Sequence, residues 1–464
     1  MKKRLPALLL VLASSAHAGH EGQSVAPGPV TALDKLSSLR QLPATPTLRR
    51  SVAVQQWTTQ NGARVYFVEA HELPMLDLRL VFDAGGARDG ALGGLASTVS
   101  RMLEEGTATR DTSAIARSFE AVGAEFDTGS YRDMAVAELR VLSDPAYRDP
   151  ALEVFADVVA HPQFPEAPFN RIMQSNEIGQ QQQEQSPAAI AGRLFYKALY
   201  DTHPYAQPPT GSRETLSKIR REDLQAFHQR YYVARNLTIA LVGDLSRRDA
   251  EALAERVSAP LAAGEAAPAQ LPVKPLAKAR HLHQAFPSTQ THIMVGAPGI
   301  AYGDPDYYAL AVGNEILGGG GFTSRLMNEI RQKRGLTYGV YSGFTQMRVP
   351  GPFVINLSTR SEQADEALKI TRQVLAEFVK NGPDANEVGE AKANIVGGYP
   401  LSTASNSSIV GFLGAMGFYG LPLDYLDSYV SRIQAVTPEQ VKDAFRRHVD
   451  PSRLLVVTVG KTKS

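Results

Sequence analysis

A small polar cluster interrupts an otherwise apolar stretch, "GLASTVSRML", at residues 94–103. Ser97, Ser100 and Arg101 stand at positions i, i+3 and i+4, so a helix would place the three side chains on one face. Leucine, valine and methionine make up most of the remainder, which predicts that the rest of this helix is buried. The chain contains no cysteine, so neither a disulfide nor a thiolate metal site accompanies the cluster.

Two segments further along the chain resemble each other. They are "LQAFHQRYYVARNLTIALVGD" at residues 224–244 and "VKDAFRRHVDPSRLLVVTVGK" at residues 441–461. Each pattern predicts a helix, a short break and an apolar strand that ends in Val-Gly, and the two copies align at an offset of about 217 residues. Self-similarity over this distance indicates two copies of one domain rather than a solenoid.

The repeat also isolates a second polar pair, Arg331 and Tyr338, within "EILGGGGFTSRLMNEIRQKRGLTYGVYSG" at residues 315–343. Matching "AVGAEFD" in the first half to "KRGLTYG" in the second aligns Gly123 with Gly335, Phe119 with Arg331 and Phe126 with Tyr338. The first half has apolar residues at both positions, as a core requires. Only the second half makes them polar. The alternative is that the two residues have no functional role, with Arg331 on a solvated helix face and Tyr338 in a strand.

The elements around these residues are strands and helices in mixed order. The segments "RVYFVEA", "LDLRLVF", "THIMVGA" and "FVINLST" have the apolar or alternating character of strands. A helix is predicted over Pro305–Leu317, capped by Asp304 and ended by Gly318, and another begins with a capping box at Thr437. The predicted fold is α+β, with two homologous α/β-roll domains, each a largely antiparallel sheet packed with helices.

Composition divides the chain into five segments. The start, "MKKRLPALLLVLASSAHA", has the charged, apolar and small-residue regions of a secretory signal peptide. We expect a signal peptide at 1–18, a Pro-rich N-terminal extension at 19–50, a first domain at 51–258, an Ala- and Pro-rich linker at 259–277 and a second domain at 278–464. The nine-residue apolar stretch of the signal is too short to span a bilayer, and no other apolar run reaches spanning length.

The net charge and the absence of cysteine indicate which partners and which cellular compartment fit this chain. Removal of Lys2, Lys3 and Arg4 with the signal changes the formal net charge from +1 to −2. This near-neutral balance does not point to nucleic acid or to an anionic membrane as a partner. A secreted chain of 464 residues without disulfides indicates a bacterial periplasm.

The stretch "GGARDGALGGLASTVSRMLEEGT" resembles the N-terminal signature of the pitrilysin/insulinase metallopeptidases. In that family the helix carries H-x-x-E-H, in which two histidines bind zinc and the glutamate activates water. The resemblance places Ser97, Ser100 and Arg101 at these three positions, so all three functional side chains are absent. Glu177, 76 residues after Arg101, matches the third zinc ligand. We expect these four to be degenerate zinc-site positions, with an ion pair between Arg101 and Glu177 and no metal in this chain.

The segment at 315–343 resembles the C-terminal signature of the same family. There, the residues matching Arg331 and Tyr338 point at the zinc site from the opposite domain, bind substrate and stabilise the developing oxyanion. Both side chains are strong directional donors to an oxygen that gains charge. The glycine run Gly318, Gly319, Gly320 and Gly321 either ends a helix loosely or, as the resemblance implies, contacts substrate. No Gly-Lys-Ser/Thr follows it, so it is not a phosphate loop.

The resemblance extends over about residues 50–460 and implies a division of labour. In two-chain members such as the mitochondrial processing peptidase, one subunit carries zinc and its partner carries the arginine and tyrosine. We therefore expect this chain to be a zinc-less, periplasmic subunit that binds extended peptide and assembles with a homologous zinc-bearing subunit. The alternatives are a catalytically inert structural or peptide-binding protein of the same fold, and a peptidase with a rebuilt metal site, for which His281 and His283 are the nearest pair in sequence.

Overall fold

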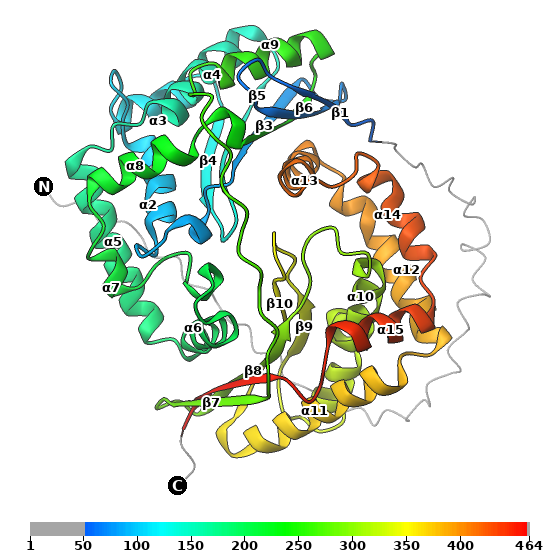
Figure 1. Cartoon of the computed structure of the whole chain (residues 1–464). Coiled ribbons are helices and arrows are strands. Elements are labelled where there is room, and N and C mark those ends of the chain that lie inside the picture. The colour runs from blue at the N-terminus through cyan, green and yellow to red at the C-terminus, as the bar shows by residue number, and fades with distance from the viewer. Residues whose placement is uncertain (1–51, 462–464) are drawn as a thin grey trace, which may run out of the picture. The chain divides into compact units, whose positions relative to one another are not determined.

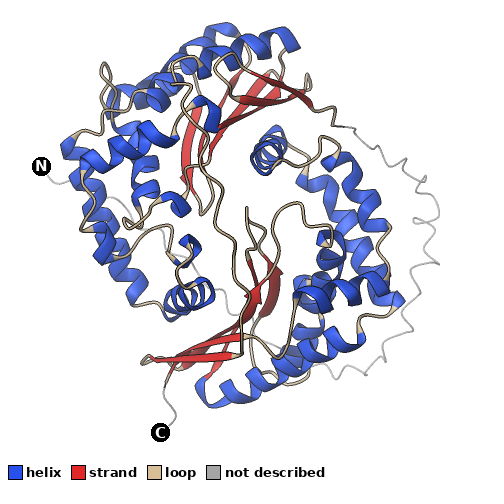
Figure 2. Ribbon diagram, viewed as in Figure 1, coloured by secondary structure: helices blue, strands red, loops and turns tan. Residues whose placement is uncertain are grey.

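The computed structural model describes residues 52–461, so the predicted signal peptide and Pro-rich extension lie outside the described residues. Two mixed sheets, each packed with helices, make up the described chain, which confirms the predicted α+β class (Figure 2). Among the helices of residues 52–461, none combines the length and the apolar character that a membrane span requires.

The first sheet has six strands in the order β1-β2-β6-β3-β5-β4. Its strands are β1 (Gln55–Thr58), β2 (Arg64–Glu69), β3 (Met75–Phe82), β4 (Glu125–Ser130), β5 (Ala135–Leu142) and β6 (Leu237–Gly243). The pair of β2 and β6 is parallel, and the other neighbouring pairs are antiparallel. Strand β4 is one edge of this sheet.

The second sheet has five strands in the order β7-β11-β8-β10-β9. Its strands are β7 (Arg280–Ala285), β8 (Gln290–Pro298), β9 (Val340–Phe344), β10 (Pro352–Arg360) and β11 (Leu455–Gly460). The pair of β7 and β11 is parallel, and the other pairs are antiparallel. Without β1, the first sheet has the same order and the same single parallel pair, so the two halves are copies of one fold, as the repeat predicts.

The helices of the first half are α2 (Leu95–Met102), α3 (Thr112–Glu120), α4 (Pro145–Ala160), α5 (Glu166–Glu184), α6 (Pro187–Tyr200), α7 (Arg213–Leu216), α8 (Arg221–Tyr231) and α9 (Arg247–Ser258). Those of the second half are α10 (Tyr307–Asn314), α11 (Ala364–Asn381), α12 (Ala385–Ser402), α13 (Asn406–Tyr419), α14 (Tyr425–Gln434) and α15 (Pro438–His448). Residues 259–279, between α9 and β7, form neither helix nor strand. The predicted capping box at Thr437 is present at the start of α15.

The predicted helix over Pro305–Leu317 differs from the observed one at both ends. Helix α10 begins at Tyr307, two residues later than predicted, because Asp304 accepts the backbone N–H of Asp306 (2.9 Å) in a turn before the helix. It then continues as a π-helix, η6 (Glu315–Gly319), before a short 3₁₀ turn, η7 (Gly321–Thr323), and a second π-helix, η8 (Met327–Gln332). The glycine run therefore joins two π-helical segments.

Each sheet buries one face against the helices of its own half and the other face against a helix of the opposite half (Figure 1). Helix α13 packs on β3 and β6, where Leu413 and Met416 meet Ala240 and Val242. After its polar first turn, its sequence "IVGFLGAMGFY" is apolar all round, as expected for a helix that is buried on most sides. In return, α6 packs on β8 and β11. The halves thus exchange one helix each.

A buried polar network also joins the halves. Asp133, in the turn between β4 and β5, is 3% exposed. Its carboxylate accepts hydrogen bonds from the hydroxyl of Tyr205, the hydroxyl of Tyr419 (3.0 Å) and the backbone N–H of Arg348 (2.8 Å). Arg348 lies in the loop between β9 and β10, and its guanidinium donates a hydrogen bond to the carbonyl oxygen of Phe418 (3.1 Å). One carboxylate of the first half therefore binds two elements of the second.

Candidate functional site

The helix predicted to carry the polar cluster is α2, and a buried carboxylate fixes its start. Asp89 accepts the backbone N–H groups of Gly94 and Ala96, both at 2.7 Å. Burial raises the pKa of Asp89 to about 7, against the opposing effect of these hydrogen bonds. On the helix, Ser97 is half-buried and Ser100 is 2% exposed. The Ser100 hydroxyl has no hydrogen-bond partner among the described residues.

The predicted ion pair between Arg101 and Glu177 is wrong. Arg101 is exposed and donates instead to the Oδ1 of Asn176 and, at 3.4 Å, to the hydroxyl of Ser175, both on α5. Glu177 faces Arg213, at 3.8 Å. Successive side chains of a helix point about 100° apart. Asn176 therefore faces Arg101 on α2, while the next residue, Glu177, faces Arg213 on α7.

The side chains at these positions do not fit zinc. Zinc sites in proteins use thiolates, imidazoles and carboxylates. Ser97 and Ser100 offer only hydroxyls, and Arg101 carries a permanent positive charge that opposes a bound cation. Glu177 is therefore the single family-type ligand left. The chemistry of this donor set assigns no zinc-dependent step to α2.

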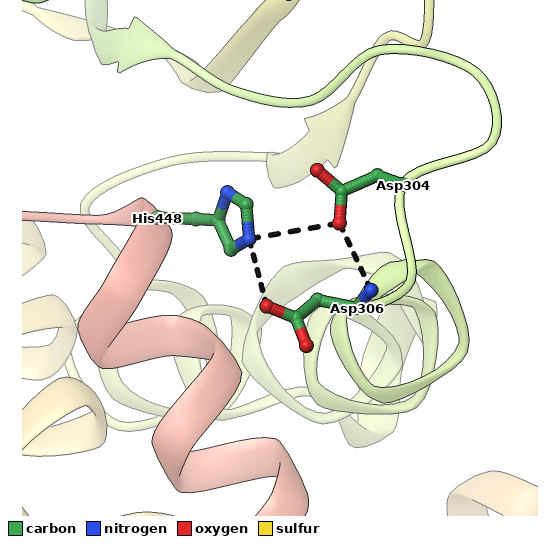
Figure 3. Close-up of side chains that lie close together, drawn as sticks. All are labelled: Asp304, Asp306 and His448. Carbon is green, nitrogen blue, oxygen red and sulfur yellow. Dashed lines mark hydrogen bonds and ion pairs between the residues drawn. The ribbon is translucent and has the colours of Figure 1, made fainter.

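One group of potential metal ligands does come together elsewhere, from residues that lie too far apart in the sequence to form a motif. Within residues 52–461, Asp304, Asp306 and His448 are the one set of three whose ligand atoms converge (Figure 3). His448 Nε2 lies 2.9 Å from Asp306 Oδ2 and 3.8 Å from Asp304 Oδ1. Arg447 already donates to both oxygens of Asp306, at 2.7 and 2.8 Å, and holds the pKa of that carboxyl below its ordinary value.

The positions of these residues explain the group without a metal. The aspartates stand at the N-terminus of α10, and Arg447 and His448 stand in the last turn of α15. Helix dipoles favour anions at the first location and cations at the second. The group is therefore an electrostatic contact between two helix ends. His281 and His283, the other candidates, both lie near the hydroxyl of Thr458, at 3.4 and 2.9 Å.

The arginine and tyrosine of the second half are both available to a ligand. Arg331 lies in the π-helix η8, is half-buried, and holds its guanidinium 4.4 Å from the centre of the Phe322 ring. Tyr338 follows η8 and is 88% exposed, and its hydroxyl has no hydrogen-bond partner among the described residues. Cation–π contact steers the arginine without using its N–H donors. Sequence reasoning missed Phe322, although it directly follows the glycine run.

The equivalent residues of the first half pack against each other and are not available to a ligand. Phe119 is 5% exposed and stacks on Phe126 with ring centres 5.0 Å apart. The alignment that pairs these residues with Arg331 and Tyr338 also pairs Gly123 with Gly335, and the two glycines share a left-handed backbone, with φ of 62° and 63°. The repeat therefore places the polar pair where the first half places core.

Packing accounts for most of the glycine run. A Cβ on Gly318 would lie 2.5 Å from the hydroxyl oxygen and 2.7 Å from the backbone nitrogen of Ser342. A Cβ on Gly319 would lie 2.7 Å from Asn314, and one on Gly320 would lie 2.7 Å from the carbonyl oxygen of Glu315. These three residues are thus required by the close approach of η6, α10 and β9. Gly321 meets no such contact but has a φ of +58°.

Replacement of Gly318 by alanine is expected to destabilise the chain by about 1–3 kcal/mol, because the new methyl group overlaps backbone that cannot move independently. The measurement is urea unfolding of the purified chain. Gly398→Ala is the matched control: a Cβ there meets nothing within 4 Å, and alanine favours the helix. Equal stabilities of the two variants would refute the packing explanation.

Comparisons with known proteins agree with this architecture. Residues 64–212 match the family model "Insulinase (Peptidase family M16)", and residues 218–395 match the model "Peptidase M16 inactive domain". A solved structure from Pseudomonas fluorescens, described as a peptidase M16 inactive domain, is 49% identical, covers 89% of this chain and 99% of that one, and has a TM-score of 0.86.

Two bacterial relatives carry contrasting names. The Bacillus subtilis protein named "Uncharacterized zinc protease YmxG" is 24% identical over 85% of this chain and 95% of its own length. The Helicobacter pylori protein named "Non-peptidase homolog YmxG" is 25% identical over 90% of this chain and 96% of its own length. Since the two family models together match well over half of its residues, the chain belongs to the insulinase peptidase family, M16.

Proposed function

We propose that this chain is the non-zinc subunit of a periplasmic M16 metallopeptidase. In this proposal it binds extended peptide and supplies Arg331 and Tyr338 to the reaction at the zinc of a homologous partner subunit. The observation that carries the proposal is the contrast between the two halves. The α2 face lacks every zinc-binding histidine, whereas the arginine and tyrosine are present, accessible and free to donate.

The chemistry assigned to this chain is hydrogen bonding to a carbonyl oxygen. Arg331 offers several N–H donors and Tyr338 offers one O–H donor. Donors placed where negative charge develops stabilise the transition state more than the bound substrate. The partner's zinc would polarise the same carbonyl. Orientation matters for this role, and the contact with the Phe322 ring favours one placement of the Arg331 guanidinium.

A catalytically inert structural or peptide-binding role is the second candidate. The name of the Helicobacter pylori relative, a non-peptidase homologue, favours it. The two candidates separate in one experiment. The chain is co-expressed with a zinc-bearing M16 subunit from the same genome, the complex is purified by a tag on one chain, and cleavage of a peptide library is compared for each chain alone and for the complex. Cleavage that requires both chains supports the first proposal, and equal cleavage by the zinc subunit alone supports the second.

The purified chain alone is expected to contain no stoichiometric zinc and to cleave no peptide, because Ser97, Ser100 and Arg101 replace the two ligands and the base. Elemental analysis after dialysis measures the zinc, and a fluorogenic peptide library measures cleavage. One tightly held zinc per chain, or cleavage that a chelator abolishes, would overturn this prediction and favour a rebuilt metal site.

The compartment is tested separately from the activity. We propose that residues 1–18 direct the chain across the inner membrane and are then removed. Fractionation of cells that express the full chain with a C-terminal tag, followed by N-terminal sequencing, checks both points. A periplasmic protein beginning at Gly19 agrees with the proposal, and a cytoplasmic protein that keeps its first residues contradicts it.

A further inference from the structure

A cavity of about 460 Å³ lies between helix α6 of the first half and the facing side of the second sheet. Its floor comes from β8, β10 and β9, and its wall comes from Ala188, Ala191 and Gly192 of α6. This volume falls in the range of about 300–1,000 Å³ that is typical of ligand sites. We call it the α6 groove.

The floor of the α6 groove carries polar side chains that the protein itself leaves unused. Strand register puts His292 opposite Ser358 and Asn356 opposite Tyr341, so all four project from one face of the sheet. Among the described residues, none of these four side chains has a hydrogen-bond partner. Tyr341 is 49% exposed, Asn356 is exposed, and His292 and Ser358 are half-buried. These donors and acceptors are therefore open to a hydrogen-bonding ligand that enters the groove.

The groove is also uncharged. None of the eleven lining residues is Asp, Glu, Lys or Arg. Burial lowers the pKa of His292, so its imidazole is neutral at pH 7. Such a lining does not suit a phosphate, a carboxylate or a metal ion, each of which needs opposite charge. It suits a neutral ligand with alternating donors and acceptors, and a polypeptide backbone has one of each at every residue.

One edge of the groove is next to Tyr338 in the chain. Gly339, which lines it, directly follows Tyr338 in the chain. We propose that the α6 groove binds an uncharged, extended segment of the peptide substrate, next to the bond that Tyr338 serves. This inference rests on the proposed function for its choice of ligand. Asn356 would hydrogen-bond the peptide backbone, and the small residues of α6 would leave room for the peptide side chains.

Gly192 gives a direct way to close the groove. A Cβ built on Gly192 meets nothing within 4 Å, and the residue lies inside α6, where leucine favours the helix more than glycine does. Gly192→Leu should therefore fold and fill the groove. Gly389→Leu is the matched control, since Gly389 is an exposed residue of α12 with equally open space at its Cβ.

The probe is a pool of fluorescein-labelled random octapeptides without Asp, Glu, Lys or Arg, and binding to the whole purified chain is followed by anisotropy. Gly192→Leu is expected to weaken binding at least 10-fold, and Gly389→Leu should bind as the natural chain does. Asn356→Ala should weaken binding about 2–10-fold, the loss of one or two hydrogen bonds. A second pool rich in Asp and Lys should bind more weakly than the neutral pool.

The outcomes separate this inference from the proposed function. Absence of binding by the natural chain, undiminished binding by Gly192→Leu or tighter binding of the charged pool would each overturn the groove assignment. None of these results bears on turnover by a complex with a zinc subunit. Conversely, if Gly192→Leu loses binding while Tyr338→Phe leaves turnover of the complex normal, the groove stands and the catalytic role fails.

Discussion

Replacement of Tyr338 by phenylalanine is expected to lower turnover by the complex with a zinc-bearing subunit by about 10–1,000-fold. The substitution removes one donor to the reacting carbonyl and little else. The side chain is 88% exposed and its hydroxyl has no partner among the described residues, so stability should change by less than about 0.5 kcal/mol. The first half already carries phenylalanine, Phe126, at the equivalent position.

Arg331→Ala should cost at least as much turnover, with some loss of substrate binding, because it removes several donors and a charge. The double variant should lose less than the product of the two single effects if both groups serve one oxygen. Turnover is normalised to zinc content, and thermal melts of each variant are recorded beside it. Tyr147→Phe, at an exposed tyrosine on α4, is the control for loss of a surface hydroxyl.

A structural role predicts the opposite pattern for these two residues. Destabilised variants or failed assembly, with normal activity in whatever complex forms, would assign Arg331 and Tyr338 to the scaffold. Normal turnover in both variants would remove the catalytic role of this chain altogether.

Replacement of Asp133 by alanine is expected to lower the free energy of unfolding by about 3–5 kcal/mol. The carboxylate accepts from Tyr205, Tyr419 and the backbone of Arg348, and its loss leaves these three donors without an acceptor. A buried polar group left unpaired costs about 1–3 kcal/mol. Burial raises the pKa of both tyrosines, so their hydroxyls remain donors over the whole accessible pH range.

Urea unfolding of the purified chain, followed by far-UV circular dichroism, measures the loss. Asp127→Ala is the matched control, since Asp127 is an exposed aspartate of the neighbouring strand β4. Its effect should stay within about 0.5 kcal/mol. An Asp133→Ala chain as stable as the natural one would show that the network does not hold the halves together.

Most features of the fold that depend on residues close together in the sequence were predicted correctly. The two Val-Gly strand ends became β6 and β11, and the capping box at Thr437 became the start of α15, because a cap and an apolar run are satisfied by near neighbours. The sequence predicts the start of α10 two residues too early. Asp304 and Pro305 fit a helix start or a turn equally well, and in the structure they form a turn. The π-helical continuation of α10 is not predicted, because a π-helix of five residues, little more than one turn, is too short to set up an apolar period of its own.

Candidate site residues could be proposed from the sequence only where one motif contains them. Arg331 and Tyr338 lie seven positions apart in the chain, so a single sequence motif nominates both, and their role stays a prediction. The partner of Arg101 depended on how α5 rotates against α2, which a single sequence does not encode locally. Asp133 and Tyr419 are 286 residues apart, and nothing near either one signals the other. The α6 groove could not be predicted from the sequence for the same reason, because its wall and its floor come from different halves of the chain.

The exchange of α6 and α13 gives the chain the architecture of a domain-swapped dimer whose two protomers have been joined. A cut within residues 259–277 would leave the first fragment with an uncovered face on β3 and β6, and the second with an uncovered face on β8 and β11. Each fragment would hold the helix that the other lacks. Covalent linkage makes this pairing independent of protein concentration. The duplicated halves have therefore lost the autonomy of separate domains and are obligate partners within one polypeptide.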